Sequence, residues 1–165
     1  MQLIDLIALF IISITTLAGA HWGALRQVIA LAATLLAIII AGRYTLLVDD
    51  ALSSFVTDIS TSALLGYLLP LLGIAAAGGL LASAIHRFAG LRLATRIDLP
   101  LGGLLGAAEG SVFVIGLLYG LARFPLPAYP TLGSSAVGRM LRLAGYPLAQ
   151  LLPETFRFAA QQVFG

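Results

Sequence analysis

The sequence predicts an all-α polytopic membrane protein, a bundle of four transmembrane helices with interfacial amphipathic helices and a short C-terminal tail. The first observation behind this is composition: of 165 residues, 60% are hydrophobic and 10% are charged, and the mean hydropathy is +1.04. A soluble domain averages about 25% charged residues, so this composition excludes a soluble globular protein. It also excludes a disordered chain, because disorder requires low hydrophobicity.

The second observation is four apolar stretches, each long enough to cross a bilayer, for which about 17–25 mostly apolar residues are needed. They cover residues 3–20, 25–46, 63–85 and 99–121. The first has no Lys or Arg before its apolar run and carries Asp5 there, a charge that does not fit a cleaved signal peptide. We therefore expect it to be a retained helix, and residues 1–122 to form a four-helix transmembrane domain.

The connections between the spans differ in character. The first, around Trp22 and Gly23, is short, so the first two helices should be antiparallel neighbours. The second, residues 47–61, has apolar and acidic residues at helical spacing, which predicts an acidic helix lying in the membrane interface. The third, residues 86–98, contains Arg87, Arg92 and Arg96, which predicts contact with anionic lipid headgroups. The alternative for this segment is a solvated basic loop that only sets orientation.

Residues 123–165 form a Pro-interrupted tail that we expect to lie in the interface rather than to cross the membrane. Three prolines between positions 125 and 130 favour an extended run. Ser134 or Ser135 can then cap a short amphipathic helix that ends near residue 143.

The distribution of arginine predicts the orientation of the chain. Lys is absent, and the first and third connections carry Arg26, Arg87, Arg92 and Arg96, whereas the opposite side has Arg43 and Arg123 close to the helix ends. The positive-inside rule then places these two connections in the cytoplasm and both termini outside. The arginines do not form a cluster with polar and aromatic residues of the kind that binds nucleic acid, so the expected partners are the lipid bilayer and its anionic headgroups.

Glu109 is the main candidate for an intramembrane polar site. It lies about ten residues into the fourth span, hence about 15 Å deep at 1.5 Å per residue. A carboxylate at that depth is costly unless it is paired, hydrated or protonated. It therefore indicates either a proton- or cation-linked site, or a structural hydrogen bond to one of the hydroxyl groups of Ser13, Thr15, Thr16, Thr34 and Tyr67.

The same span carries a glycine strip at Gly102, Gly106 and Gly110, four residues apart and so on one helix face. Such a strip lets a second helix backbone approach closely, and a matching strip in the third span comprises Ala75, Gly79 and Ser83. The strip predicts tight packing within the bundle, in a homo-oligomer or against a membrane partner. The alternative is a thin-walled pore.

Signatures of catalysis are missing from the sequence. It contains no Cys, no nucleophile elbow, no pair of His at metal-binding spacing and no phosphate-binding loop. We therefore expect a non-enzymatic protein with no cofactor and no metal. Asp98, followed by Leu99 and Pro100, has the pattern of a helix N-cap.

Most of residues 1–122 resembles the colicin V production protein family, a bacterial inner-membrane family with about four spans. The resemblance rests on three features. The first is the acidic residue at the start of the first span, and the second is the junction from Trp22 to Gln27, which resembles the family's Arg-Gly-x-x-Arg-Glu turn. The third is the acid and the glycines that open the fourth span. The positions that the resemblance carries over are Asp5, Gly23, Arg26, Asp98, Gly102, Gly106 and Gly110. Gln27 departs from an expected acid, Leu99 from a basic residue, and Glu109 from a basic or neutral one, so the resemblance assigns Glu109 no role.

The resemblance implies a multi-pass protein of the bacterial inner membrane, with both termini periplasmic in the orientation predicted above. It also implies a part in colicin V production or export and in envelope homeostasis. Two molecular roles stay open. One is a scaffold or accessory factor for export machinery, and the other is a small oligomeric channel or proton-linked transporter that uses Glu109.

Overall fold

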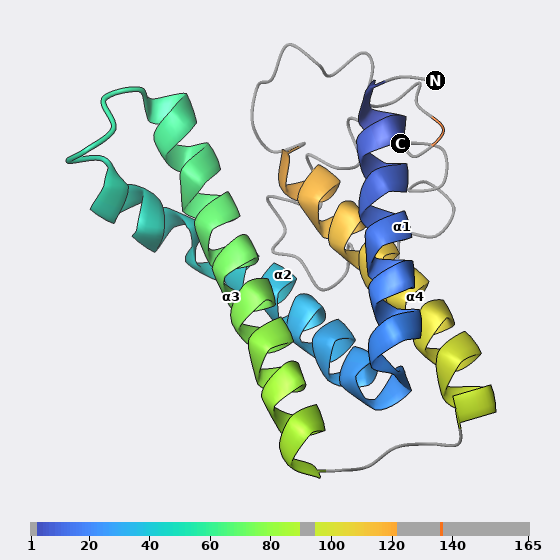
Figure 1. Ribbon diagram of the computed structural model, residues 1–165. Helices are drawn as coiled ribbons and strands as arrows, with labels where there is room; N and C mark the ends of the chain where they lie inside the picture. Colours follow the sequence, from blue (N-terminus) through green and yellow to red (C-terminus); the bar gives the residue numbers. More distant parts are fainter. Residues whose placement is uncertain (1–2, 90–94, 122–135, 137–165) are drawn as a thin grey trace.

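The computed structural model of the protein describes residues 3–89, 95–121 and 136, and these contain helices and no strand. The four helices are α1 (Leu3–Trp22), α2 (Ala24–Leu52), α3 (Ile59–Ala89) and α4 (Thr95–Leu121) (Figure 1). All four are long and apolar enough to cross a membrane. The all-α class and the four spanning helices are thus confirmed.

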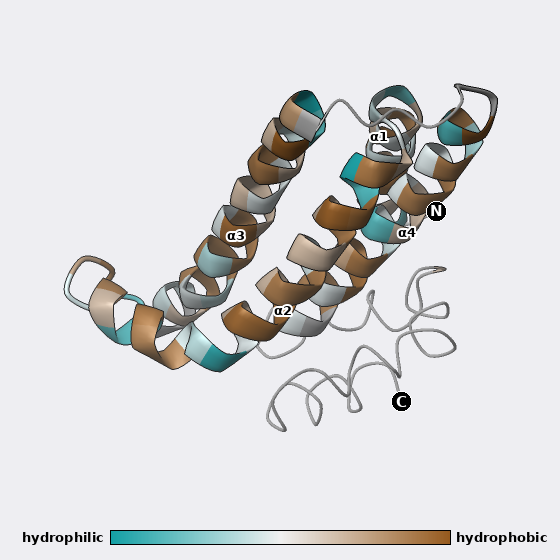
Figure 2. Ribbon diagram, turned by 90° about the horizontal axis from the view of Figure 1, so that it is seen from below, coloured by the Kyte–Doolittle hydropathy of each residue, from teal (hydrophilic) through white to brown (hydrophobic). Residues whose placement is uncertain are grey.

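The helices pack side by side in the order α1, α4, α2, α3 rather than in the order of the chain. α1 packs on α4, α4 also packs on α2, and α2 packs on α3, whereas α1 with α2 and α3 with α4 share few contacts. Figure 2 shows α3 on one side, α2 beside it and α1 and α4 together on the other side, with apolar residues predominating along the helices. The prediction that the first two helices are packed neighbours is therefore wrong, because the short turn sets their direction but α4 inserts beside α1.

The turn between α1 and α2 depends on Gly23. Its φ of 91° lies in the left-handed region that favours glycine, and its N–H donates to the carbonyl oxygen of Gly19 at 2.9 Å. This arrangement ends α1 in the manner of a helix C-terminal glycine. α2 begins at the next residue, so the chain reverses direction within one residue.

The predicted interfacial helix over residues 47–61 is not formed. α2 continues to Leu52, and α3 begins at Ile59, with the Asp58 carboxylate accepting the N–H of Thr61 at 2.9 Å. Asp49 Oδ1 accepts the Ser62 hydroxyl at 2.5 Å and so joins the two helices. The polar residues thus stabilise a helical hairpin instead of forming a separate helix. Sequence periodicity cannot distinguish the two, because the helical spacing of apolar residues from position 47 onward continues that of α2.

The core lies where α2, α3 and α4 meet. Its buried members are Ala8, Ala37, Ile38, Ala41, Tyr67, Leu71, Val114 and Leu118. The largest is Tyr67, whose hydroxyl donates to the carbonyl oxygen of Gly116 at 2.8 Å. Gly120, one turn further along α4, leaves the space for the ring of Tyr67, because a methyl group there would collide with it. Gly116 likewise accommodates Ile38 of α2. These two glycines therefore seat side chains of α2 and α3 against α4.

Candidate functional site

Glu109 lies on the face of α4 that packs on α2, and two polar side chains of α2 meet it. Gln27 Nε2 donates a hydrogen bond to Glu109 Oε2, and Thr34 Oγ1 lies 3.5 Å from Glu109 Oε1. Gln27 is 1% exposed and Thr34 is 2% exposed, so both are enclosed by protein. We name Gln27, Thr34 and Glu109 the α2–α4 polar site.

Of the five hydroxyl groups considered as partners for Glu109, the structure selects Thr34. Thr15 and Thr16 donate to carbonyl oxygens of their own helix, and Tyr67 donates to α4. Sequence reasoning missed Gln27 as a partner. The signal was present, because Gln27 is the only side-chain amide between residues 3 and 121 and lies seven residues, two helical turns, before Thr34.

Arg26 stands next to this site and connects α2 to two other helices. Its Nε donates to the Ser83 hydroxyl at 2.9 Å, and Ser83 in turn donates to the carbonyl oxygen of Gly79 at 2.7 Å. The guanidinium lies 3.7 Å from the centroid of the Trp22 ring, a cation–π contact. Arg26 and the Glu109 carboxylate also attract each other electrostatically.

Asp98 caps a helix, but not the one that the sequence predicts. α4 already begins at Thr95, so Asp98 lies in its first turn rather than at its N-cap. Its Oδ1 instead accepts the N–H of Ala24, the first residue of α2, at 2.8 Å. Gly23, the residue before α2, supplies no side-chain cap of its own. A residue 74 positions away thus satisfies one of the free N–H groups that begin α2.

The glycine strip of α4 packs against α1, not against the strip of α3 that sequence spacing matched to it. Methyl groups built at Gly102 and Gly106 would collide with the carbonyl groups of Gly19 and Thr15, and one at Gly110 with the Thr15 side chain. The two backbones are therefore in contact. A methyl group built at Gly79 of α3 would meet no described residue within 4 Å, so the pairing of α4 with α3 is wrong.

The remaining predicted positions lie apart from the polar site. Asp5 is buried, with 7% of its surface exposed, at the start of α1. Arg87 is exposed near the end of α3. Arg92 lies outside the described residues, as does the predicted tail helix apart from residue 136, and the side chain of Arg96 is not described. Contact of these arginines with lipid headgroups remains a prediction.

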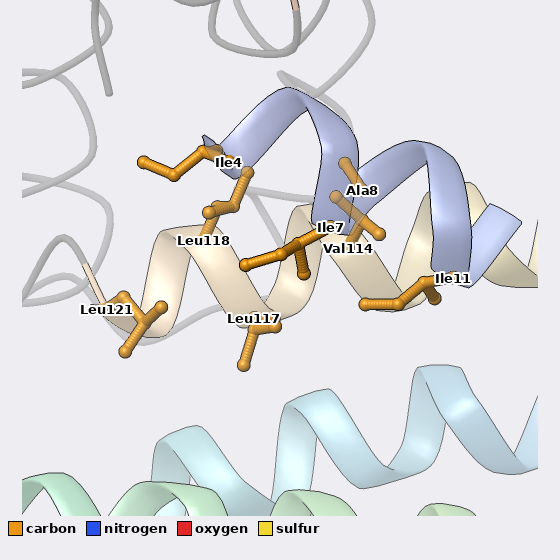
Figure 3. A pocket seen from close by; sticks show the side chains of 8 residues that line it. All are labelled: Ile4, Ile7, Ala8, Ile11, Val114, Leu117, Leu118 and Leu121. Atoms are coloured by element: carbon orange, nitrogen blue, oxygen red, sulfur yellow. The ribbon is translucent and has the colours of Figure 1, made fainter. Parts of the chain in front are cut away.

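Beyond Gly110, α1 and α4 line a groove of about 170 Å³ (Figure 3). It is lined by α1 between Ile4 and Ile11 and by α4 between Val114 and Leu121, with aliphatic side chains only. Such a groove offers no group for catalysis or for binding a polar ligand.

Within the described parts of the chain, no group of three His, Cys, Asp or Glu side chains could hold a metal ion. The α2–α4 polar site has one carboxylate, one amide and one hydroxyl. It can join two helices, hold a proton, or supply oxygen atoms to a cation.

The comparisons with known proteins agree with this helical membrane architecture. No curated protein and no solved structure matches the chain. A family model described as colicin V production protein matches residues 4–145. The match includes all four helices, the turn at Gly23, the cap at Asp98 and the glycine strip that joins α4 to α1. The chain is therefore a member of the colicin V production protein family.

Proposed function

We propose that this protein is a non-enzymatic scaffold or accessory factor of the bacterial inner membrane that supports the production or export of a colicin V-type toxin and envelope homeostasis. Membership of the family supports the link to toxin production, and this is not a known enzyme family. The four spanning helices support a multi-pass location. A scaffold requires a surface that a partner can bind within the membrane.

The observation that carries the proposal is a face of α3 that no other described helix covers. α3 stands at one edge of the row of helices and packs mainly on α2. Gly73, Ala76 and Ala77 are exposed there, and a methyl group built at Gly73 would meet none of the described residues within 4 Å. Helices in membranes associate through such small residues, because they let backbones approach closely. We name Gly73, Ala76 and Ala77 the small-residue face of α3.

The test compares substitutions on this face with a matched substitution elsewhere. A deletion strain is complemented with wild type, Ala76→Leu, Ala77→Leu or Ala32→Leu, the last at an exposed position of α2. Toxin export, survival under envelope stress and membrane level by immunoblot are measured. We expect the two α3 variants to fail at normal membrane level and Ala32→Leu to rescue, since lipid tails tolerate leucine. Rescue by all three variants would contradict binding through this face.

The orientation belongs to the same proposal. With the α1–α2 turn and the α3–α4 connection in the cytoplasm, Arg87, Arg92 and Arg96 lie at the anionic headgroups and both termini are periplasmic. Single-Cys variants at Arg92 and Ser134, labelled with an impermeant thiol reagent from either side, test this orientation. Reaction of Ser134→Cys from the cytoplasm alone would reverse it.

A second candidate function is a small oligomeric channel or proton-linked transporter, and the observation that favours it is a mid-span carboxylate in a polar site. Glu109 faces Gln27 and Thr34 inside the protein instead of an oppositely charged partner in direct contact. A conduit that uses the carboxylate should lose function in Glu109→Gln, whereas a scaffold should tolerate it. Glu154→Gln, at the only other glutamate of the chain, is the matched control in the complementation assay.

A further inference from the structure

One oxygen atom of the α2–α4 polar site lacks a partner. Gln27 Oε1 is buried and has no hydrogen-bond partner among the described residues. Water does not reach it freely either, because Gln27 is only 1% exposed. Buried polar atoms are almost always paired, because an unpaired one has lost its water without compensation. This acceptor belongs to the same amide group whose Nε2 donates to Glu109. It therefore belongs to an amide group that contacts the carboxylate, where a positively charged ligand would satisfy it.

The spacing of Glu109 Oε1 and Thr34 Oγ1 fits a cation. Because Gln27 Nε2 occupies Glu109 Oε2, the remaining acceptors are Gln27 Oε1, Glu109 Oε1 and Thr34 Oγ1. The last two are 3.5 Å apart, which is long for an O–H···O hydrogen bond. Two oxygens that bind one cation at right angles, at Ca²⁺-like distances of about 2.4 Å, are about 3.4 Å apart. Na⁺ has nearly the same ionic radius as Ca²⁺.

The charge of the site selects a monovalent ion. A single carboxylate neutralises one positive charge, and a divalent ion would leave an uncompensated charge inside the membrane. Arg26 is the charged side chain nearest to the site on α2, but its guanidinium is held by Ser83 and Trp22. Its positive charge lowers the affinity for a cation without occupying the three oxygens.

We propose that Gln27, Thr34 and Glu109 bind a small monovalent cation, for which Na⁺ is the probe. The site goes beyond the scaffold role and does not depend on it, because an ion that only joins α2 to α4 needs no transport. The complementation assay tests the scaffold role, whereas ion binding to the purified protein tests the cation site. Failure of one proposal is therefore distinguishable from failure of the other.

The experiment uses dicyclohexylcarbodiimide, which modifies protonated carboxyl groups within membranes. The purified full-length protein in detergent is treated at one pH and one ionic strength in NaCl, KCl or choline chloride, and modification of Glu109 is followed by mass spectrometry. We expect Na⁺ to slow the modification about tenfold when its concentration is about ten times the dissociation constant, by simple mass action. Equal rates in all three salts would overturn the proposal.

Variants locate the effect. Thr34→Val and Gln27→Met should still react at Glu109 but lose the protection by Na⁺. Thr45→Val is the matched control, because Thr45 is a buried threonine of the same helix whose hydroxyl donates to the carbonyl oxygen of Ala41 at 2.5 Å. Full protection in Thr34→Val, or its loss in Thr45→Val, would show that the ligands are assigned wrongly.

A second measurement covers the case in which Glu109 does not react in any salt. Thermal unfolding of wild type and Thr34→Val is then compared in NaCl and choline chloride. A bound ion raises the unfolding midpoint of wild type in NaCl only. The absence of a Na⁺-specific rise in wild type would overturn the proposal.

Discussion

Replacing Asp98 with Ala removes a cap that one helix supplies to another. In the native protein, Asp98 Oδ1 accepts the N–H of Ala24 at 2.8 Å, and Ala24 is 5% exposed. The carboxylate also lies at the positive end of the α2 dipole. Without it, the N–H of Ala24 is left buried and loses the acceptor that connects α4 to the start of α2.

The size of the loss follows from these two effects. Loss of an N-cap side chain costs about 0.5–2 kcal/mol, and an unsatisfied buried donor costs about 1–3 kcal/mol. Both values describe the same N–H group, so they overlap, and we expect the free energy of unfolding to fall by about 2 kcal/mol. That is about a 30-fold change in the unfolding equilibrium. Asp98→Asn keeps an oxygen acceptor and loses only the charge, so its loss should be about 1 kcal/mol or less.

The assay is equilibrium unfolding of the purified protein by SDS in mixed micelles. Trp22 is the only tryptophan and lies at the turn that Asp98 supports, so its fluorescence reports on this region. Asp50→Ala, at an exposed acid near the other end of α2, should change the stability by less than about 0.5 kcal/mol. If Asp98→Ala unfolds no more readily than Asp50→Ala, the cap does not stabilise the fold.

Two further predictions use the same unfolding assay. Gly106→Ala should lower the free energy of unfolding by about 1–3 kcal/mol, because the added methyl group meets the carbonyl of Thr15 and forces two backbones apart. Gly73→Ala is the control: its methyl group meets no described residue, so the variant should be as stable as wild type or more stable. Tyr67→Phe should cost about 1 kcal/mol, since it removes the buried hydrogen bond to the Gly116 carbonyl; an unchanged midpoint would show that this bond contributes nothing net.

Composition and run length were sufficient to predict the fold class, because a chain with so few charges must place its apolar helices in lipid. Helix order was not predictable from the same information. A glycine strip predicts that another helix backbone approaches closely, but not which helix this is. The strip that begins at Gly102 contacts α1 instead of α3. Contact between these helices depends on the whole set of surfaces, which no local pattern encodes.

The candidate site shows the same limit. Glu109 was identifiable from its depth alone, and Thr34 was among its predicted partners. Gln27 was noticed only as a departure from the family pattern, although its place two helical turns before Thr34 was a signal that it shares a helix face with that residue. The role of Asp98 could not be read from its sequence neighbours, since the N–H that it caps is 74 residues away. Tertiary contacts therefore determine both the pairing of Gln27 with Glu109 and the capping of α2 by Asp98.

The structure brings two departures from the family pattern into contact, and this yields a final prediction. Gln27 stands where the resemblance expects an acid, and Glu109 stands where it expects a basic or neutral residue, yet Gln27 donates to Glu109. An acid at position 27 with a neutral residue at 109, and the reverse in this chain, each leave one carboxylate near Arg26. Exchanging the two side chains in the double variant Gln27→Glu, Glu109→Gln should therefore retain stability close to that of wild type.

The single variants should behave differently. Gln27→Glu alone places two carboxylates in contact and should be the most destabilised, and Glu109→Gln alone removes the charge that Arg26 attracts. Residues in direct contact typically couple by about 0.5–3 kcal/mol in a double-mutant cycle, and we expect about 2 kcal/mol here. If the two single losses simply add, the acid and the amide do not act as a pair. If they couple as expected, the carboxylate serves the contact between α2 and α4 from either helix, and Na⁺ should protect it at position 27 as we expect at Glu109.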